Sequence, residues 1–359
     1  MAEGNSSNCD VMELSEAVKF ICRHAQDVSV NRKKIKKVAQ DVVRYLMNHI
    51  ESFNYSNTYV MRPITYPVST TLTTADWLFV LHTLNFSLWY PKDSKQWKVN
   101  GKKGYIGLCN AINRAYEDGK PIWNPEYYTK MTKSELECIL QSDDGEPEIP
   151  LIDERLRILH EVGEVLLQKY KGTFMECLKS SEYDADKLMK LLFDEFESYR
   201  DEVKYDGKKV CFLVKARSLV IDIWDYFKES PNKFKLNKSK MMSTIFTDYC
   251  IPQLLFKLKI LQYSGGFKKR LKNSNVPLEH GSREEIEIRG CSLFAANKIY
   301  KEVKKLIERL VLEKRLSDSV TPVTQLVVDN FLLKFIFTYN YDNNSLKKYP
   351  LHYIRTVHY

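Results

Sequence analysis

Four aspartates lie among strongly apolar neighbours and are the first candidates for chemistry. Asp76 precedes Trp77 near a predicted helix start, whereas Asp222, Asp248 and Asp329 interrupt the runs LVIDIWDYF, STIFTDYCIPQLL and QLVVDNFLLKF. A carboxylate that enters an apolar interior must be hydrogen-bonded, paired with a cation or neutral. Such groups are common at functional sites, but an aspartate can also simply bond backbone N–H groups at a helix start. The pattern alone favours this structural role for each of them, and for Asp76 a capping or helix-dipole role.

Asp248 has one further feature, a proline four residues later. Pro252 has no backbone N–H and biases residue 251 away from helical geometry. The segment therefore predicts a helix boundary near Asp248, and a carboxylate at such a break can face a cavity. The alternative is a kinked helix that carries a solvated aspartate.

A dense aromatic segment, NFSLWYP, spans Asn85 to Pro91. Phe86, Trp89 and Tyr90 could stack on a flat heterocycle while the amide of Asn85 binds its edge. Ordinary core packing is the alternative, and the pattern alone favours it.

Several classes of site are excluded by the motifs that the sequence lacks. The 13 glycines form no phosphate-binding loop, and neither an HExxH motif nor a serine elbow occurs. The eight cysteines form no CxxC pair and no zinc-site spacing, so we expect reduced thiols and a cytoplasmic protein. The polar N-terminus has no signal-peptide core, and no apolar run is long enough to span a membrane.

The net charge of +9 favours anionic partners without choosing among them. Basic residues gather in RKKIKK (Arg32 to Lys37) and KKRLK (Lys268 to Lys272), and single lysines follow through 298–315. Solvated helix faces are the favoured interpretation of each cluster. A non-enzymatic helical protein that binds tRNA or another nucleic acid is the alternative function, but no contiguous basic stripe in the sequence supports it.

Helical periodicity dominates the chain of 359 residues. We predict helices over 38–53, 150–170, 185–197, 213–228, 241–262, 284–315 and 322–339, a capping box from Thr132 to Glu135, and a helix in TTADWLFVLHTL that its threonines can cap. The one clear strand signal is a hairpin turn at Asn100-Gly101. We therefore expect a mainly α protein with at most a short β-hairpin, a disordered segment over 1–12 and a single domain over 13–359, in which two packed helical lobes are possible.

Four motifs in this order resemble the queuosine salvage protein family, which comprises queuosine 5′-phosphate N-glycosylase/hydrolases. They are DWLFVLHTLNFSLW, FTDYCIPQLL, EIRGCSLF and PLHYIRTVHY, and the resemblance runs from about residue 13 to the end. It implies a fold similar to helix-hairpin-helix DNA glycosylases. It also implies hydrolysis of the N-glycosidic bond of queuosine 5′-monophosphate to release queuine, without a metal or organic cofactor. The partner would be this small molecule, with no stable nucleic-acid complex and no membrane.

The resemblance also assigns roles to residues. Asp248 matches the family aspartate that acts as nucleophile or as stabiliser of the oxocarbenium-like ribose. Phe246 matches a residue that contacts the base, and Thr247 lies between the two as a further substrate-binding position. Asp329 matches an acidic residue that could accept hydrogen bonds from the edge of a guanine-like base. A DNA glycosylase proper follows only from the fold analogy, because the sequence displays no surface for base flipping.

Two departures concern the base and its arm. Leu333 and Lys334 stand where family members often have an aromatic residue and an aspartate, which puts the contact to the cationic arm of queuine in doubt. A family histidine is missing near Pro63. The candidate ligands of the 5′-phosphate, chosen by charge, are Lys215, Arg289, His352 and Arg355, and each could instead be a structural ion-pair member.

Overall fold

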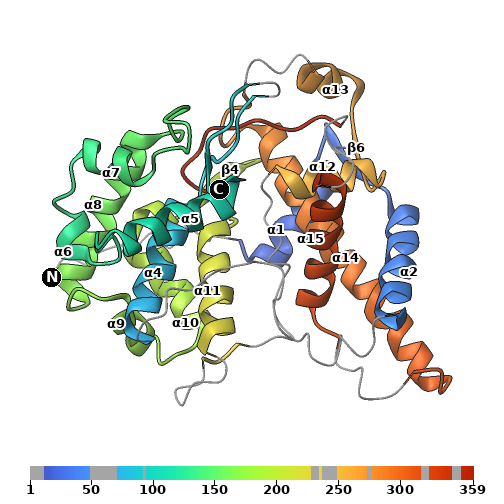
Figure 1. The fold of residues 1–359 in the computed structure, drawn as a ribbon. Coiled ribbons are helices and arrows are strands. Elements are labelled where there is room, and N and C mark those ends of the chain that lie inside the picture. The colour runs from blue at the N-terminus through green and yellow to red at the C-terminus, as the bar shows by residue number, and fades with distance from the viewer. Residues whose placement is uncertain are drawn as a thin grey trace, which may run out of the picture.

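Two helical lobes, each with its own hydrophobic cluster, make up the protein in a computed structural model (Figure 1). The structure describes residues 12–48, 71–91, 94–227, 234–236, 249–272, 277–316, 323–341 and 349–359. The prediction of a mainly α fold is confirmed. The likeness to DNA glycosylases and the extent of the single domain stay predictions.

The first lobe, here called the α8 lobe, is drawn in cyan, green and yellow in Figure 1. Its helices are α4 (Thr71–Leu84), α5 (Gly104–Glu117), α6 (Pro125–Tyr128), α7 (Lys133–Ile139), α8 (Ile152–Lys169), α9 (Phe174–Ser180), α10 (Ala185–Glu195) and α11 (Val214–Phe227), with a 3-10 turn η1 (Glu197–Tyr199). Helix α4 lies at the centre of the lobe. It is apolar on all sides, and every side chain from Thr74 to Leu84 is buried, as expected of a helix surrounded by others.

The second lobe, the α14 lobe, joins the beginning and the end of the chain. It contains α1 (Leu14–His24), α2 (Arg32–Asn48), α12 (Cys250–Lys257), α13 (Gly265–Lys272), α14 (Arg283–Leu312) and α15 (Gln325–Tyr341). Helix α1 crosses α14 closely at Gly290, where a Cβ atom would lie 2.7 Å from the side chain of Ile21. The absence of a side chain at position 290 therefore sets the separation of these two helices.

Within the described residues, three antiparallel ribbons join the helices, two more than we predicted. They are β1 (Val28–Val30) with β6 (Leu261–Tyr263), β2 (Lys98–Val99) with β3 (Lys102–Lys103), and β4 (Glu202–Tyr205) with β5 (Lys208–Cys211). The predicted turn at Asn100-Gly101 is confirmed, and both residues have positive φ angles, 50° and 68°. The prediction of one helix over 241–262 is wrong at its end, because α12 stops at Lys257 and β6 pairs with β1.

The helix starts match the predictions in part. The capping box between Thr132 and Glu135 is present at the start of α7. Asp76 does bond a helix terminus, but not that of its own helix: its carboxylate accepts bonds from Phe174 N and Thr173 Oγ1 at the start of α9. Burial raises the pKa of Asp76 to about 6, against the effect of these two donors.

Candidate active site

A cluster of buried charged side chains, with one that is partly buried, lies where the two lobes meet, and we call it the polar centre. Its members are Asp201, Lys215, Arg217, Glu285, Arg289 and Asp329. Asp201 lies between η1 and β4, Lys215 and Arg217 lie in the first turn of α11, and the rest lie on α14 and α15. Charges at this depth must be paired or serve a ligand.

Arg289 is the fully paired cation of the polar centre. Its guanidinium donates to Asp201 Oδ2 and, over 3.0 Å, to Glu285 Oε1, and it lies 4.0 Å from the centroid of the Phe212 ring. Although burial opposes it, the two carboxylates raise the pKa of Arg289. Burial alone would raise the pKa of Asp201 and of Glu285, but the charge of Arg289 outweighs this effect and lowers both pKa values. This ion pair connects α14 to the chain that leaves the α8 lobe, so Arg289 has the structural ion-pair role that was the alternative to a phosphate ligand.

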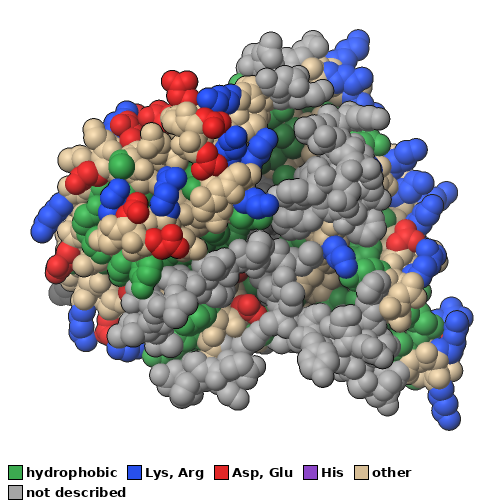
Figure 2. All heavy atoms as spheres, viewed as in Figure 1, with side chains coloured by type: hydrophobic (Ala, Val, Ile, Leu, Met, Phe, Trp, Pro, Cys, Tyr) green, Lys and Arg blue, Asp and Glu red, His purple; other side chains and the backbone are tan. Residues whose placement is uncertain are grey.

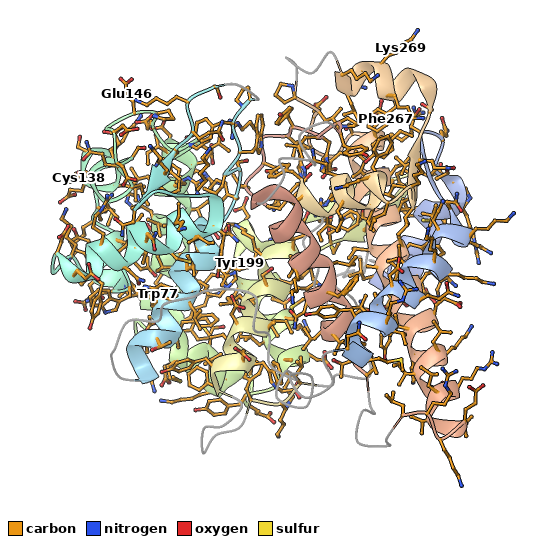
Figure 3. All side chains as sticks on the ribbon, turned by 45° about the vertical axis from the view of Figure 1, so that its right-hand side comes forward. Trp77, Cys138, Glu146, Tyr199, Phe267 and Lys269 are labelled. Carbon is orange, nitrogen blue, oxygen red and sulfur yellow. The ribbon has the colours of Figure 1, made fainter. Side chains whose placement is uncertain are left out.

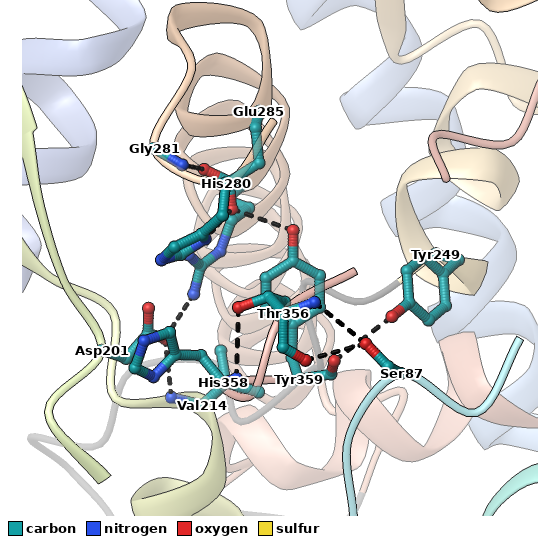
Figure 4. Close-up of polar contacts among 11 residues, drawn as sticks. Ser87, Asp201, Val214, Tyr249, His280, Gly281, Glu285, Thr356, His358 and Tyr359 are labelled. Atoms are coloured by element: carbon teal, nitrogen blue, oxygen red, sulfur yellow. Dashed lines mark hydrogen bonds and ion pairs between the residues drawn. The ribbon is translucent and has the colours of Figure 1, made fainter. Parts of the chain in front are cut away.

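The segment 349–359 connects the same two lobes by hydrogen bonds (Figure 4). Tyr359 donates through its hydroxyl to Glu285 Oε1 over 2.9 Å. Its main-chain oxygen accepts from Ser87 N at 2.9 Å and from the Tyr249 hydroxyl at 3.2 Å. Ser87 and Thr356 exchange two more bonds, at 2.8 and 3.0 Å. The segment NFSLW is therefore fixed against the end of the chain and against Tyr249.

Lys215 brings an unsatisfied cation into the polar centre. Its Nζ atom has no hydrogen-bond partner among the described residues and lies 5.0 Å from the centroid of the Tyr199 ring and 5.3 Å from that of Phe86. Burial lowers the pKa of Lys215 to about 7, although the carboxylates of Glu161 and Asp201 act to raise it. A buried, unsatisfied ammonium group is suited to an anionic ligand.

Asp329 and Arg217 lie near one another across the lobe boundary. Asp329 is buried in the second turn of α15, and Gln325 Nε2 donates to its Oδ1 over 2.8 Å. Burial lowers the pKa of Arg217 to about 10, and the charge of Asp329 is the largest influence that raises it. The Nη2 atom of Arg217 and the Oε1 atom of Gln325 have no hydrogen-bond partner in the described part of the chain. Asp329 is therefore at a site with spare donors and acceptors, which suits recognition of a polar ligand.

Two other predicted binding residues point elsewhere. Lys334, one turn after Asp329, donates to the Tyr45 hydroxyl and lies 4.6 Å from the centroid of that ring, so it faces α2. Leu333 packs against the hydrophobic cluster of the α14 lobe. Lys334 therefore contacts α2 in this structure.

The remaining phosphate candidates are occupied or neutral. Arg355 donates to the main-chain oxygen of Ser87 over 2.8 Å and stacks on Trp89 at 3.7 Å from the ring centroid. Burial lowers the pKa of His352 to about 4, so this histidine is neutral at pH 7 and carries no charge toward a phosphate. Of the four candidates chosen by charge, Lys215 and His352 have a buried nitrogen without a hydrogen-bond partner among the described residues, and of these two Lys215 is the one that can carry a charge near pH 7.

Phe246, Thr247 and Asp248 lie outside the described residues, whereas Tyr249 is described and buried. The ring of Tyr249 lies 6.1 Å from that of Trp89 and 5.9 Å from that of Tyr359, measured between centroids. Helix α12 begins at Cys250, which confirms a helix boundary beside Asp248. Pro252 is not the break itself. It lies within the first turn of α12, where its missing N–H removes no intrahelical bond.

The other aspartate and the aromatic segment have structural partners. Asp222 Oδ2 lies 2.7 Å from His82 Nε2 and accepts a bond from the Tyr105 hydroxyl over 3.3 Å, inside the α8 lobe. Phe86 is buried and packs under the guanidinium of Arg155 at 4.2 Å from the ring centroid. Core packing, the alternative that the pattern favoured, therefore holds for Phe86.

Asp201, Arg217 and Tyr359 were not predicted from the sequence. Asp201 stands in ESYRDEVKY and Arg217 in LVKARSLV, where the surrounding pattern gives no reason to single out either charge. No three His, Cys, Asp or Glu side chains of the described residues are grouped so that they could hold a metal ion.

The fold and the polar centre define a helical protein with a buried ionic site between two lobes. A family model described as queuosine salvage protein matches residues 65–359. Three curated relatives named queuosine 5′-phosphate N-glycosylase/hydrolase are similar to this chain. The Bos taurus protein is 33% identical over 96% of this chain and 98% of its own length. The Mus musculus protein is 30% identical over 96% and 98%, and the Schizosaccharomyces pombe protein is 33% identical over 80% and 84%.

The chain belongs to the queuosine salvage protein family. The resemblance that the four motifs carried is thereby confirmed. In the described part of the chain, every helix is too short or too polar to cross a membrane.

Proposed function

We propose that this protein hydrolyses the N-glycosidic bond of queuosine 5′-monophosphate and releases queuine for re-use in tRNA. Family membership, with relatives that carry this activity in their names, is the observation on which the proposal depends. The polar centre supports it, because it contains the cation of Lys215, which has no hydrogen-bond partner among the described residues, and the buried carboxylate of Asp329. A small nucleotide is sufficient as the partner, so turnover requires no stable nucleic-acid complex.

The chemistry requires a carboxylate beside the sugar, and we assign it to Asp248. As the bond to the base breaks, positive charge develops on the ribose, and a fixed carboxylate in a water-poor site stabilises this charge better than one in bulk solvent. Asp248 acts either in this way or as a nucleophile that adds to the anomeric carbon, after which water releases the sugar. The peptide bond joins it directly to Tyr249, which is anchored to Tyr359.

Substrate binding divides between two kinds of contact. The carboxylate of Asp329 presents two acceptors to the adjacent donors on the edge of a guanine-like base. Lys215 is the proposed cation for the 5′-phosphate, since a phosphate would provide the hydrogen-bond partner that its Nζ atom lacks among the described residues. Phe246 and Thr247 complete the proposed base contact. Arg355 supports the site indirectly, by holding Ser87 and Trp89.

Base release, followed by mass spectrometry, tests the proposal. The purified protein is incubated separately with queuosine 5′-monophosphate, the 3′-monophosphate and the nucleoside. We expect free queuine from the 5′-monophosphate, loss of turnover in Asp248→Asn, and normal turnover in Asp118→Asn, which changes an exposed aspartate of the α8 lobe. Full activity in a folded Asp248→Asn protein would refute the mechanism, and no release from any substrate would refute the function.

We also propose a cytoplasmic location. All seven described cysteines are free thiols, which suits a reducing compartment. Fractionation of cells with an antibody against the protein tests the location.

A further inference from the structure

A surface groove of about 570 Å³ runs along the β1–β6 ribbon on the α14 lobe. Its lining includes Phe256 and Tyr349, both partly exposed, and the three lysines Lys257, Lys259 and Lys268. Tyr349 is held beside α12 by Gln253, whose Nε2 atom donates to its main-chain oxygen over 2.9 Å. The groove thus combines aromatic rings with cations, and none of these residues belongs to the polar centre.

The basic run at the start of α2 continues this groove. Asn31 N donates to the main-chain oxygen of Ile260 over 2.8 Å. Arg32 directly follows Asn31 and Lys259 directly precedes Ile260, so this bond brings the two cations to the same place. The RKKIKK run, which is remote from residues 257–268 in sequence, therefore begins at the edge of the groove. Figure 2 shows Lys and Arg side chains along the side of the molecule where Figure 1 places α13, α2 and the end of α14.

The cations at the start of α2 are not neutralised by described carboxylates, whereas several cations of α13 and of the end of α14 are in ion pairs. Arg32, Lys33, Lys36 and Lys37 are exposed, and no carboxylate of the described residues lies within ion-pair distance of any of them. In Figure 3, Lys269 of α13 extends outward while Phe267 turns into the lobe. The pKa of Lys298 on α14 is lowered by partial burial and then by the charges of Lys301, Arg32 and Lys305. Because Arg32 belongs to α2, cations of α2 and α14 lie close enough to repel one another.

We infer that the groove and the first turns of α2 form a docking surface for single-stranded RNA. Cations that follow a backbone, together with rings on which bases can stack, are the means by which proteins bind single strands. The basic run from Arg32 to Lys37 extends this surface by about 9 Å along the start of α2. The choice of RNA over DNA rests on the proposed function, because the substrate proposed there is a ribonucleotide.

Another anionic surface, a membrane, fits these residues less well. Binding to a membrane surface uses apolar side chains interspersed with the cations. The large exposed apolar side chains of the described residues are Met47, Leu167 and Leu312, and none of them lies in the groove or in the first three turns of α2. The surface therefore has the charge for a membrane, but its apolar side chains, Phe256 and Tyr349, are only partly exposed.

Fluorescence anisotropy with a labelled oligoribonucleotide of about 12 nucleotides, a length within the usual site sizes, tests the inference. The test variant is Lys33→Glu/Lys36→Glu/Lys37→Glu, which changes one face of α2. The matched control is Lys102→Glu/Lys103→Glu/Lys130→Glu, which changes the net charge equally at exposed positions of the α8 lobe. Binding is measured at several salt concentrations, with the unlabelled duplex, queuosine 5′-monophosphate and anionic phospholipid vesicles as competitors.

We expect the affinity of the unchanged protein to fall steeply with salt, and the slope of log K against log salt to be smaller by about 2 in the test variant, because each lost phosphate contact removes about 0.7. A fourfold rise in salt concentration should therefore reduce the ratio between the RNA affinities of the unchanged protein and the test variant about sixteenfold. The control should bind like the unchanged protein, and base release should be normal in both variants.

Four results would overturn the inference. These are no salt-dependent binding, equal weakening in both triple variants, stronger competition by the duplex than by the single strand, and displacement by vesicles but not by RNA. Competition by queuosine 5′-monophosphate at its working concentration would also contradict it, since it would place the strand at the polar centre. Loss of base release is a separate outcome, because it concerns the proposed function and not this surface.

Discussion

Replacement of Arg289 by methionine should destabilise the protein strongly, because two carboxylates would lose their buried cation. Methionine keeps part of the apolar contact with Phe212 and Tyr359 but leaves Asp201 and Glu285 without their counter-charge. Removal of one partner from a buried ion pair typically costs about 3–5 kcal/mol.

The two carboxylates keep other hydrogen-bond donors, so the expected loss in the free energy of unfolding is at the lower end of that range, about 3 kcal/mol. Val214 N still donates to Asp201 over 3.3 Å. Gly281 N and the Tyr359 hydroxyl still donate to Glu285, over 3.1 and 2.9 Å. The triple variant Asp201→Asn/Glu285→Gln/Arg289→Met removes the charges together, and it should recover most of the loss.

Urea unfolding followed by circular dichroism measures these free energies. Arg289 lowers the pKa of both carboxylates, so its contribution is present above their unfolded pKa values and is lost as pH falls through the folded values. The difference between the unchanged protein and Arg289→Met should therefore shrink in acid. The control is Lys169→Met, which breaks a surface pair with Glu195 and should cost no more than about 1 kcal/mol. A loss in Arg289→Met no larger than in this control, or a triple variant less stable than the single one, would refute the reasoning.

Three more predictions concern positions described above. Gly290→Ala should cost about 1–3 kcal/mol by pressing a methyl group onto Ile21, and the loss should be less than additive with that of Ile21→Ala in a double-mutant cycle by urea unfolding. Asp76 has a raised pKa of about 6, so its protonated form stabilises the fold at low pH, and this contribution of about 3 kcal/mol is lost as pH rises from about 4 through 6. Asp76→Asn should flatten that part of the stability profile, and an unchanged profile would contradict the assignment. Lys215→Met should raise KM for the 5′-monophosphate by about 10- to 100-fold and leave KM for the nucleoside nearly unchanged. In the unchanged protein, the affinity for the phosphate should fall as pH rises through about 7, and equal effects on both substrates would count against a phosphate contact.

Periodicity and capping predicted most of the helices because these signals are local. The capping box of Thr132 and the turn at Asn100-Gly101 are encoded within a few residues. The ribbon β1–β6 could not be predicted in this way, since LQY at 261–263 gains its partner from residues 28–30. Pairing of two short strands far apart in the chain overrode the helical pattern that extended to residue 262.

The polar centre was predictable only in part, for the same reason. Asp329 was singled out because a carboxylate interrupts an apolar run, and it is buried at the site. Asp201 could not be recognised, because the cation that makes it important, Arg289, lies 88 residues away. The basic surface was missed similarly, because the bond between Asn31 and Ile260 brings the RKKIKK run beside Lys259, which is remote from it in the sequence.

The joining of the two chain ends in the α14 lobe has a consequence for the order of folding. The core of the α8 lobe comes almost wholly from residues 75–234, so this lobe can complete most of its core while the ribosome is still synthesising the rest. The apolar faces of α1 and α2, with Ile21, Val38 and Val42, must wait for α14, which comes more than 200 residues later. Long-range contacts of this kind form slowly. The first helices of the nascent chain therefore stay exposed the longest, and they are where a chaperone would be needed most.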